Sequence, residues 1–186
     1  MLTFIKMKKE IFENIEIPEG ITIELVGNKV KVKGPEGEIS RKFDPGKAKI
    51  ELKENQIVIG HKNASKNEKK RINTILAHIK NMFKGVTTKF EYKLKVCYGH
   101  FPFTLKQEGN KVIVKNFLGE KVERVVNLPE EIEMEINKEI ITIKSVDKEL
   151  AGQAAANFET ATKIKGRDKR KFQDGVYIIE KAGKKI

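Results

Sequence analysis

The chain has 186 residues, of which 39% are hydrophobic and 34% are charged, and its formal net charge is +12. This apolar content can fill a core, which excludes a disordered polyelectrolyte, and the length allows one ordinary domain or two small ones. The positive charge favours a polyanionic partner, either nucleic acid or an anionic membrane surface. A basic surface that is simply solvated would also account for the charge.

The start of the chain does not have the apolar centre of a signal peptide. Lys6, Lys8, Lys9 and Glu10 interrupt its apolar residues, and no run anywhere approaches the ~18 apolar residues of a membrane span. Cys97 is the single cysteine, so an intramolecular disulfide is excluded. We therefore expect a cytoplasmic protein without a membrane segment.

A block of twelve residues occurs twice. GNKVKVKGPEGE at residues 27–38 returns as GNKVIVKNFLGE at residues 109–120, with eight of the twelve positions identical. Turn residues that hairpins commonly share could explain the Gly-Asn pair but not the whole block. The chain therefore contains an internal duplication.

The block predicts a β-hairpin. Residues 21–25 and 29–33 alternate apolar and polar side chains, which is typical of strands with one buried face. The Gly-Asn pair at residues 27–28 tolerates the positive φ of a two-residue turn. The resulting register places Leu25 opposite Val30 and Ile23 opposite Val32. GPEG at residues 34–37 predicts a turn into a further strand, and in the second copy Glu108 should face Lys111.

Short strand-like runs follow each hairpin, at residues 47–52 and 56–60 in the first copy and at residues 131–136 and 139–144 in the second. A helix comes next in both copies. Ser65 can cap the first helix, Glu68 completes a capping box, and Gly85 is a natural end. Its buried face should be an apolar stripe of Ile72, Ile75, Leu76, Ile79 and Phe83.

The second helix is expected from Asp147 to about Thr162. One side of it carries Leu150, Ala154, Phe158 and Ala161, and its small residues should allow a close approach to a sheet. Strands followed by one helix, twice over, predict an α+β fold of two similar domains, each a small and mainly antiparallel β-sheet packed against one helix. We expect the first domain to span residues 1–86 and the second to span residues 87–186.

Catalytic and metal-binding patterns are weak. His61, His78 and His100 have no companions at ligand spacing, and Cys97 lies in an expected strand, where a small apolar role is more common than a nucleophilic one. No glycine-rich loop is followed by the Lys-Ser or Lys-Thr pair of a phosphate-binding motif. We therefore expect no enzyme activity, no cofactor, no metal and no small-molecule substrate.

Residues 98–103, with the sequence YGHFPF, place three aromatic rings around a proline. If these rings are exposed they could stack on bases, whereas buried rings would fill the core beside the second hairpin. We favour the buried arrangement. A group of basic residues at the start of the first helix is interpreted as a solvated face; it consists of Lys62, Lys66, Lys69, Lys70 and Arg71.

The densest charge lies after the second helix. Residues 163–171, KIKGRDKRK, contain six basic residues and one acid, more than a helix C-terminus requires. Arg167 and Arg170 can grip a phosphate with two hydrogen bonds or stack on a base, and Gly166 lets the backbone turn tightly. The segment is not an amphipathic helix, and the chain has no recognisable DNA-reading helix. A loop of mixed Lys and Arg fits the phosphates and irregular shape of folded RNA.

The sequence AGQAAANFETATKIKGRDKRKFQDGVYI at residues 151–178, placed after a duplicated α+β unit, resembles the archaeal and eukaryotic branch of the large-subunit ribosomal protein L-six (uL6-type) family. The resemblance extends over nearly the whole chain, beginning with EIPEGITIELVGNKVKVKGPEGE. It implies a non-catalytic ribosomal component that binds 23S-type rRNA near the stalk base and the sarcin–ricin region, chiefly through its second domain. The bacterial branch has a Tyr-Lys-Gly-Lys-Gly pattern where KIKGRDKRKF stands here.

The residues that match the family's rRNA-binding end are Lys163, Lys165, Gly166, Arg167, Lys169, Arg170, Lys171, Phe172 and Gln173. The resemblance also implies neighbouring large-subunit proteins near the stalk base as partners, and we expect no homo-oligomer. Two alternatives stay open: a free-standing RNA-binding or RNA-processing protein, and an accessory protein that binds any polyanion.

Overall fold

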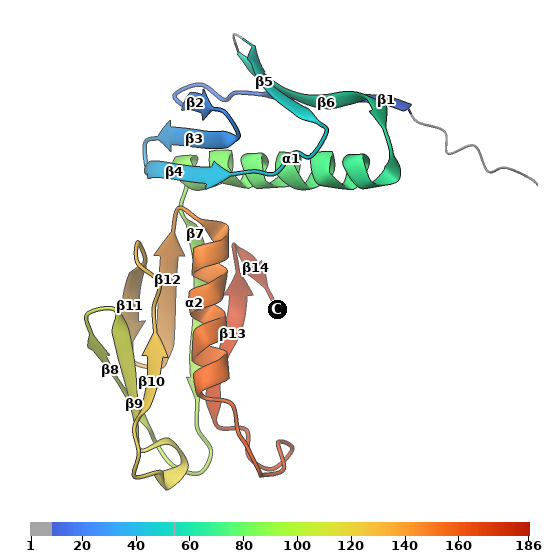
Figure 1. The fold of residues 1–186 in the computed structure, drawn as a ribbon. Coiled ribbons are helices and arrows are strands. Elements are labelled where there is room, and N and C mark those ends of the chain that lie inside the picture. The colour runs from blue at the N-terminus through green and yellow to red at the C-terminus, as the bar shows by residue number, and fades with distance from the viewer. Residues whose placement is uncertain (1–8, 54) are drawn as a thin grey trace, which may run out of the picture. The chain divides into compact units, whose positions relative to one another are not determined.

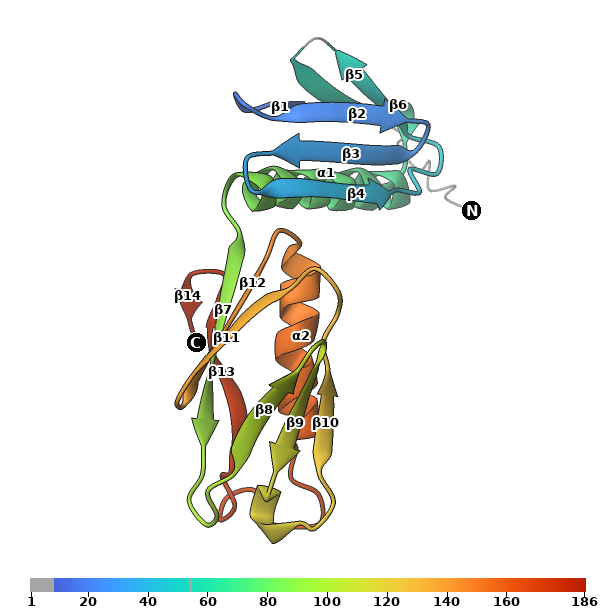
Figure 2. The same ribbon diagram turned by 90° about the vertical axis from the view of Figure 1, so that its left-hand side faces the viewer.

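A computed structural model describes residues 9–53 and 55–186, and the chain divides into two compact units, residues 1–88 and 89–186. The division expected from the sequence, after residue 86, lies two residues before the one in the structure. Figures 1 and 2 show the strands and helix of each unit from two directions. The units are described one at a time.

The first unit contains two three-stranded antiparallel sheets and a long helix (Figure 1). Its elements are β1 (Lys9–Glu16), β2 (Thr22–Val26), β3 (Lys29–Gly34), β4 (Gly37–Lys42), β5 (Lys49–Lys53), β6 (Gln56–Ala64) and α1 (Lys66–Thr87). The strand orders are β1-β6-β5 and β2-β3-β4. Helix α1 packs against strands of both sheets, which makes one shared core.

Helix α1 begins where the sequence predicts. Ser65 is the N-cap, and its capping box with Glu68 is complete. The five residues of the expected apolar stripe are all buried. The helix does not end at Gly85, however, but continues to Thr87. Its last turn is held by tertiary contacts, because Val86 is fully buried and its carbonyl oxygen accepts a hydrogen bond from the Glu36 amide at 3.0 Å.

The predicted hairpins have the expected register. Leu25 pairs with Val30 and Ile23 with Val32 across β2 and β3, and residues 34–37 turn the chain into β4. In the second unit Glu108 faces Lys111, as predicted. The Glu108 carboxylate forms an ion pair with Lys106, 2.8 Å between Nζ and Oε1, because residues two apart on a strand share a face.

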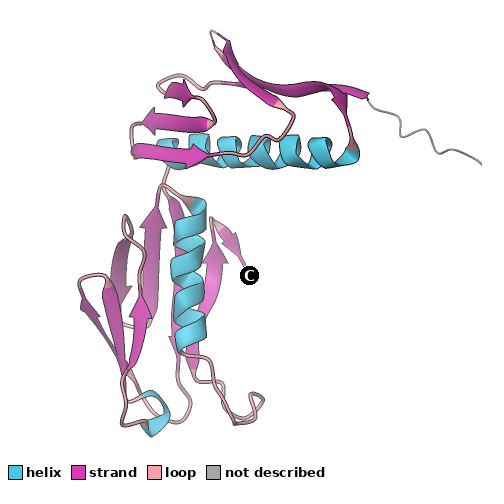
Figure 3. Ribbon diagram, viewed as in Figure 1, coloured by secondary structure: helices cyan, strands magenta, loops and turns pink. Residues whose placement is uncertain are grey.

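The second unit combines a five-stranded sheet, a three-stranded sheet and a helix (Figure 3). Its elements are β7 (Phe90–Cys97), β8 (Thr104–Glu108), β9 (Lys111–Lys115), the 3-10 helix η1 (Phe117–Gly119), β10 (Arg124–Asn127), β11 (Glu133–Asn137), β12 (Ile140–Ser145), α2 (Lys148–Ala161), β13 (Gly175–Lys181) and β14 (Lys184–Lys185). The strand orders are β11-β12-β7-β13-β14 and β10-β9-β8, with antiparallel neighbours. The α+β fold built from a duplicated unit is confirmed.

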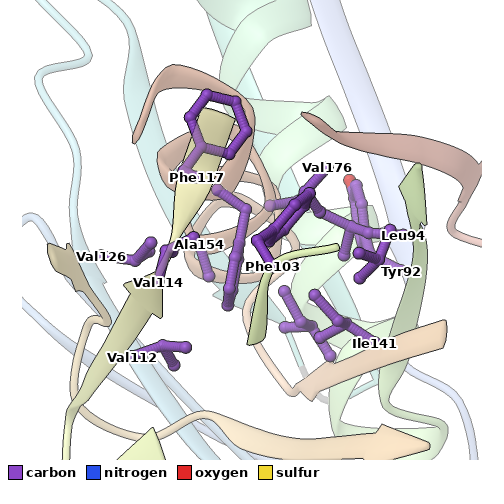
Figure 4. Packing of buried hydrophobic residues seen from close by; sticks show 14 of the residues in the cluster. Tyr92, Leu94, Phe103, Val112, Val114, Phe117, Val126, Ile141, Ala154 and Val176 are labelled. Carbon is purple, nitrogen blue, oxygen red and sulfur yellow. The ribbon is translucent and has the colours of Figure 1, made fainter. Parts of the chain in front are cut away.

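Helix α2 lies against strands of both sheets of its unit. Asp147 caps it, and the small side chains of Ala151, Ala154 and Ala155 are fully buried. Side chains from α2 and from both sheets meet in one core (Figure 4). Phe103 and Phe117 pack edge to face there, with ring centroids 5.2 Å apart, and so tie the loops before β8 and after β9 to the core.

The two copies of the repeated block diverge after their hairpins. In the first copy the chain turns directly into β4. In the second copy Asn116 and Leu118 adopt positive φ angles of 61° and 52°, and the chain forms η1 before it enters β10. This extra loop lies at the same end of the second unit as the loops 98–103 and 162–174 (Figures 1 and 2).

Candidate nucleic-acid interface

The predicted site residues form the connection between α2 and β13. We call residues 163–173 the basic loop. Its six Lys and Arg residues are exposed, as are Gly166 and Gln173, whereas Phe172 is partly buried. The six predicted cations therefore lie exposed on one connecting loop of the second unit, the loop that joins α2 to β13 in Figure 1.

The loop leaves helix α2 through a buried threonine. The Thr162 hydroxyl donates to the Phe158 carbonyl at 2.9 Å and accepts a hydrogen bond from the Val176 amide at 3.0 Å. This one side chain therefore joins the end of the helix to the start of strand β13. Ile164 is also buried, so it anchors the loop between the exposed Lys163 and Lys165.

Arg124, at the start of β10, holds the same end of the loop. Its Nη1 donates to the carbonyl oxygens of Ala161 and Lys163, at 2.8 and 3.1 Å. Its Nε and Nη2 form a two-pronged contact with the Glu120 carboxylate at 2.7 and 2.6 Å. The guanidinium carbon also lies 4.3 Å from the centroid of the Phe117 ring. Arg124 thus fixes the loop backbone while its charge is satisfied by Glu120.

The pKa of Glu120 reflects the positive charges of Arg124 and of the basic loop. Its pKa lies below the usual value, first because Arg124 hydrogen-bonds its carboxylate, and also because of the positive charges of Arg167 and Lys165. Glu120, on the loop that contains η1, is therefore close enough to the basic loop to respond to its charge, and Arg124 already occupies its carboxylate.

A tight turn shapes the middle of the basic loop. Gly166 has a φ of +69°, which favours glycine, and the Asp168 carbonyl accepts hydrogen bonds from the amides of Lys171 and Phe172. The Asp168 carboxylate binds Arg170 through both its backbone amide, at 3.0 Å, and its guanidinium, at 2.9 Å for Nη2. These bonds lower the pKa of Asp168, and the side chain of Arg170 still remains 90% exposed. Arg170 can therefore exchange this carboxylate for a phosphate.

The loop ends at a buried carboxylate. Asp174 is 1% exposed and accepts hydrogen bonds from the backbone amides of Gly99, at 2.8 Å, and His100, at 3.0 Å. The His100 ring contributes a third contact, 2.8 Å from Nδ1 to Oδ2. Burial alone would raise the pKa of Asp174, but the hydrogen bonds from His100 and Gly99 outweigh it and hold the pKa at about 2.

Strand pairing brings these distant residues together. Strand β13 pairs with β7 so that Gly175 lies opposite Cys97. Asp174 comes just before β13, and residues 98–100 come just after β7. Because the two strands are antiparallel, these residues must meet beyond the Gly175–Cys97 pair.

An aromatic stack completes the loop. The rings of His100 and Phe172 are stacked, with centroids 4.5 Å apart and planes inclined by 22°. The Arg167 guanidinium lies 4.9 Å from the centroid of the Phe172 ring. Phe172 therefore anchors the loop against residue 100 and orients a cation at the same time.

Sequence reasoning missed three residues that shape this site, namely Arg124, His100 and Asp174. None has a signal in its neighbouring sequence. The contacts through which Arg124 holds the basic loop, and the contact between Asp174 and His100, span 37 or more residues of the chain, so only the tertiary structure shows these roles. Among the aromatics of residues 98–103, the expected burial is correct only for Phe103.

The basic group at the start of α1 lies on the first unit and is not gathered on one loop. Arg71 forms an exposed ion pair with Asp44 at 3.3 Å, and Lys66, Lys69 and Lys70 are exposed or partly exposed along the first turns of α1. Lys62 contributes to a shallow cleft on the first unit, which Phe12, Lys47 and Lys49 also line.

Residues 9–53 and 55–186 contain no cluster of three or more His, Cys, Asp or Glu side chains arranged to hold a metal ion. None of their helices has the length and apolar character that crossing a membrane requires.

Comparison with known proteins gives a consistent result. The model of the family described as "Ribosomal protein L6" matches residues 17–89 and 102–175, one segment in each unit. A protein of Methanobrevibacter smithii named "Large ribosomal subunit protein uL6" is 45% identical over 171 residues, covering 92% of this chain and 96% of the relative. Proteins with the same name from Methanothrix thermoacetophila and Aeropyrum pernix are each 41% identical, covering 94% and 92% of this chain and 99% and 94% of the relatives.

Proposed function

The chain belongs to the ribosomal protein L6 family and is a structural, non-enzymatic component of the large subunit of cytoplasmic ribosomes, and we propose that it binds 23S-type rRNA through the basic loop of its second unit. The family explains the duplicated sequence, because its model matches once in each unit.

The observation that carries the proposal is the way the basic loop is built. Buried groups at both ends, Thr162 with Ile164 and then Asp174, fix the backbone while the cations between them point into solvent. A loop needs no such anchoring if its lysines only keep the protein soluble. Fixed cations at fixed spacing suit the phosphates of a folded RNA, whose shape is also fixed.

The residues that we propose to contact rRNA are Lys163, Lys165, Gly166, Arg167, Lys169, Arg170, Lys171, Phe172 and Gln173. The lysines and arginines would neutralise phosphates, and Gly166 would let the backbone come close to the RNA. Phe172 would act mainly by holding Arg167 and the loop in place, since His100 already stacks on its ring.

The resemblance in the C-terminal motif supports a finer location, near the stalk base and the sarcin–ricin region of the large subunit. Neighbouring large-subunit proteins at the stalk base would be the protein partners. We also propose that residues 1–86 and 87–186 act as separate domains. The second would make the main rRNA contacts, and the first would extend the scaffold or meet neighbouring proteins.

A salt titration of rRNA binding tests the proposal. Affinity for a 3′-region fragment of large-subunit rRNA is measured for the intact chain and for a variant with Ala at Lys163, Lys165, Arg167, Lys169, Arg170 and Lys171. If each side chain meets a phosphate, the slope of log affinity against log salt should be shallower in the variant by roughly four to six, taking about 0.7–0.9 per contact.

A matched control removes charge from the first unit, with Ala at Lys62, Lys66, Lys69, Lys70 and Arg71. The proposal expects this control to keep a slope close to that of the intact chain. If the control loses the slope and the basic-loop variant keeps it, the RNA contacts lie on the first unit instead. Co-sedimentation with large subunits through a high-salt wash distinguishes a ribosomal component from a polyanion-binding accessory protein.

A further inference from the structure

The loop between β7 and β8 carries three aromatic residues whose environments differ. Phe103 is buried in the core, and Tyr98 contacts it edge to face with centroids 6.3 Å apart. The Tyr98 hydroxyl also donates to Glu139 at 3.3 Å. Phe101 is 47% exposed, and its ring makes no ring contact with any residue in the described part of the chain. Tyr98 is as exposed, at 46%, but its ring already contacts Phe103 and its hydroxyl contacts Glu139. Phe101 is therefore the exposed ring of this loop that no other described ring engages.

A single exposed phenylalanine is ordinary on a protein surface, but Phe101 occupies a particular position. The amide of His100, the preceding residue, is bonded to the buried Asp174, and the His100 ring is stacked on Phe172. Asp174 and Phe172 belong to the end of the basic loop. The backbone at Phe101 is thus fixed beside the cations rather than carried on an independent loop.

The segment that His100 ties to the loop of Phe101 is the basic loop, which is cationic. Residues 98–103 contain no acid, and the one exposed acid of the basic loop, Asp168, is bonded to Arg170. Arg167 lies over the Phe172 ring, and Phe172 is the residue on which the His100 ring stacks. A ligand at this place meets an aromatic face and phosphate-binding cations together.

We propose that Phe101 and the adjacent basic loop form a subsite for an unpaired RNA base, which stacks on the Phe101 ring while its phosphates meet Arg167 and the neighbouring lysines. The proposal rests on the proposed rRNA binding and adds a contact that charge does not provide. Proteins that bind unpaired nucleotides combine these two features, a basic track and an aromatic platform.

The two contributions can be separated by experiment, because a neutral ring releases no counterions. Removing Phe101 should weaken binding without changing the salt slope. Base stacking on an aromatic ring corresponds to roughly a 5- to 150-fold change in Kd. Removing a cation of the basic loop should instead lower the slope by about 0.7–0.9.

The test measures Kd and salt slope for the rRNA fragment with the full chain carrying Phe101→Ala, Phe101→Tyr or Phe101→Leu. We expect Phe101→Ala and Phe101→Leu to raise Kd by roughly 5- to 150-fold at an unchanged slope, and Phe101→Tyr to bind like the parent. Phe12→Ala removes a similarly exposed ring, 49% exposed, from the first unit and should leave Kd unchanged. Thermal unfolding of each variant checks that the fold is intact.

Several results would overturn the subsite. If Phe101→Ala bound as tightly as the parent while the basic-loop variant lost its salt slope, rRNA binding would stand and the subsite would be wrong. If Phe101→Leu kept full affinity for the rRNA fragment, the contact would be apolar burial against the RNA and not base stacking. If Phe12→Ala lost as much affinity for the rRNA fragment as Phe101→Ala, the effect would belong to exposed rings in general and not to Phe101. Absence of binding by the parent would remove the proposed function and the subsite together.

Discussion

The buried carboxylate of Asp174 is bonded twice to His100, at 3.0 Å by the backbone amide and at 2.8 Å by Nδ1, although the two residues lie 74 positions apart in the chain. This contact joins the end of the basic loop to the loop after β7. It is the link on which the geometry of the candidate interface depends.

Replacing Asp174 by Asn tests that link. The amide oxygen can still accept the Gly99 and His100 amides that share Oδ1, but without a negative charge, and an NH2 group replaces Oδ2 at the His100 ring. The hydrogen bonds to the amides are then weaker, and the charge-assisted contact with the ring is lost. We expect the free energy of unfolding to fall by about 1–3 kcal/mol. Urea denaturation measures the change. Asp44→Asn, at an exposed ion pair with Arg71, should cost less than about 1 kcal/mol. Equal losses in the two variants would show that Asp174 is not a special anchor.

The same carboxylate predicts a pH dependence. Its pKa is about 2 in the folded protein against 3.8 for an ordinary Asp, so the unfolded chain binds the proton more readily. Its contribution, about 2 kcal/mol from a shift of this size, is present above about pH 4 and disappears as the pH falls towards 2. The stability difference between the parent and Asp174→Asn should therefore shrink over that range in urea denaturation. A difference that stays constant down to pH 2 would contradict the lowered pKa.

Arg124 should stabilise the loop through geometry as well as charge. Arg124→Lys keeps the charge, but a lysine cannot form a bidentate contact with Glu120 and also donate hydrogen bonds to the Ala161 and Lys163 carbonyls. We expect a loss of about 1–3 kcal/mol in unfolding free energy and faster amide hydrogen exchange around residues 163–165. Arg71→Lys, at an exposed pair, is the control and should change neither. Unchanged exchange in Arg124→Lys would mean that Thr162 and Ile164 hold this end of the loop without Arg124.

In the proposed complex, Asp168 would compete with an rRNA phosphate for Arg170. Asp168→Asn removes the one exposed acid of the basic loop and releases the Arg170 guanidinium from its carboxylate partner. If Arg170 then meets an rRNA phosphate, affinity should rise and the salt slope should steepen by up to about 0.9. Glu13→Gln makes the same change of charge on an exposed residue of the first unit. Equal gains in both variants would assign the effect to net charge instead of to Arg170.

The cap of helix α1 offers a prediction for the first unit. Ser65→Ala removes the hydroxyl that accepts the Asn67 amide and that completes the capping box with Glu68. The expected loss is about 0.5–2 kcal/mol in unfolding free energy, measured by urea denaturation. Ser40→Ala, at an exposed position of β4, should have almost no effect. A loss that is no larger than that of Ser40→Ala would mean that packing alone defines the helix start.

Much of the fold could be predicted from local patterns. The pairing of Ile23 with Val32 follows from a two-residue turn and strict alternation, and the start of α1 follows from Ser65 and Glu68. The end of α1 could not be predicted in this way. Gly85 favours an end locally, but the buried Val86 and its bond to the Glu36 amide hold one more half-turn in the helix.

The sequence by itself determined the duplication, the α+β class, the buried face of α1 and the cationic loop, because each follows from a local pattern or from a local block that recurs. For α2 the expected face was right only in part: Ala154 and Phe158 are buried, but Ala151 and Ala155 complete that face, whereas Leu150 and Ala161 are only partly buried. Only the tertiary structure decided how that loop is held. Asp174 meets His100 because Gly175 pairs with Cys97 across β13 and β7, and Arg124 reaches Lys163 because β10 and α2 pack together. A buried polar group requires a partner with correct geometry, and the chain provides that partner only when strands distant in sequence come together.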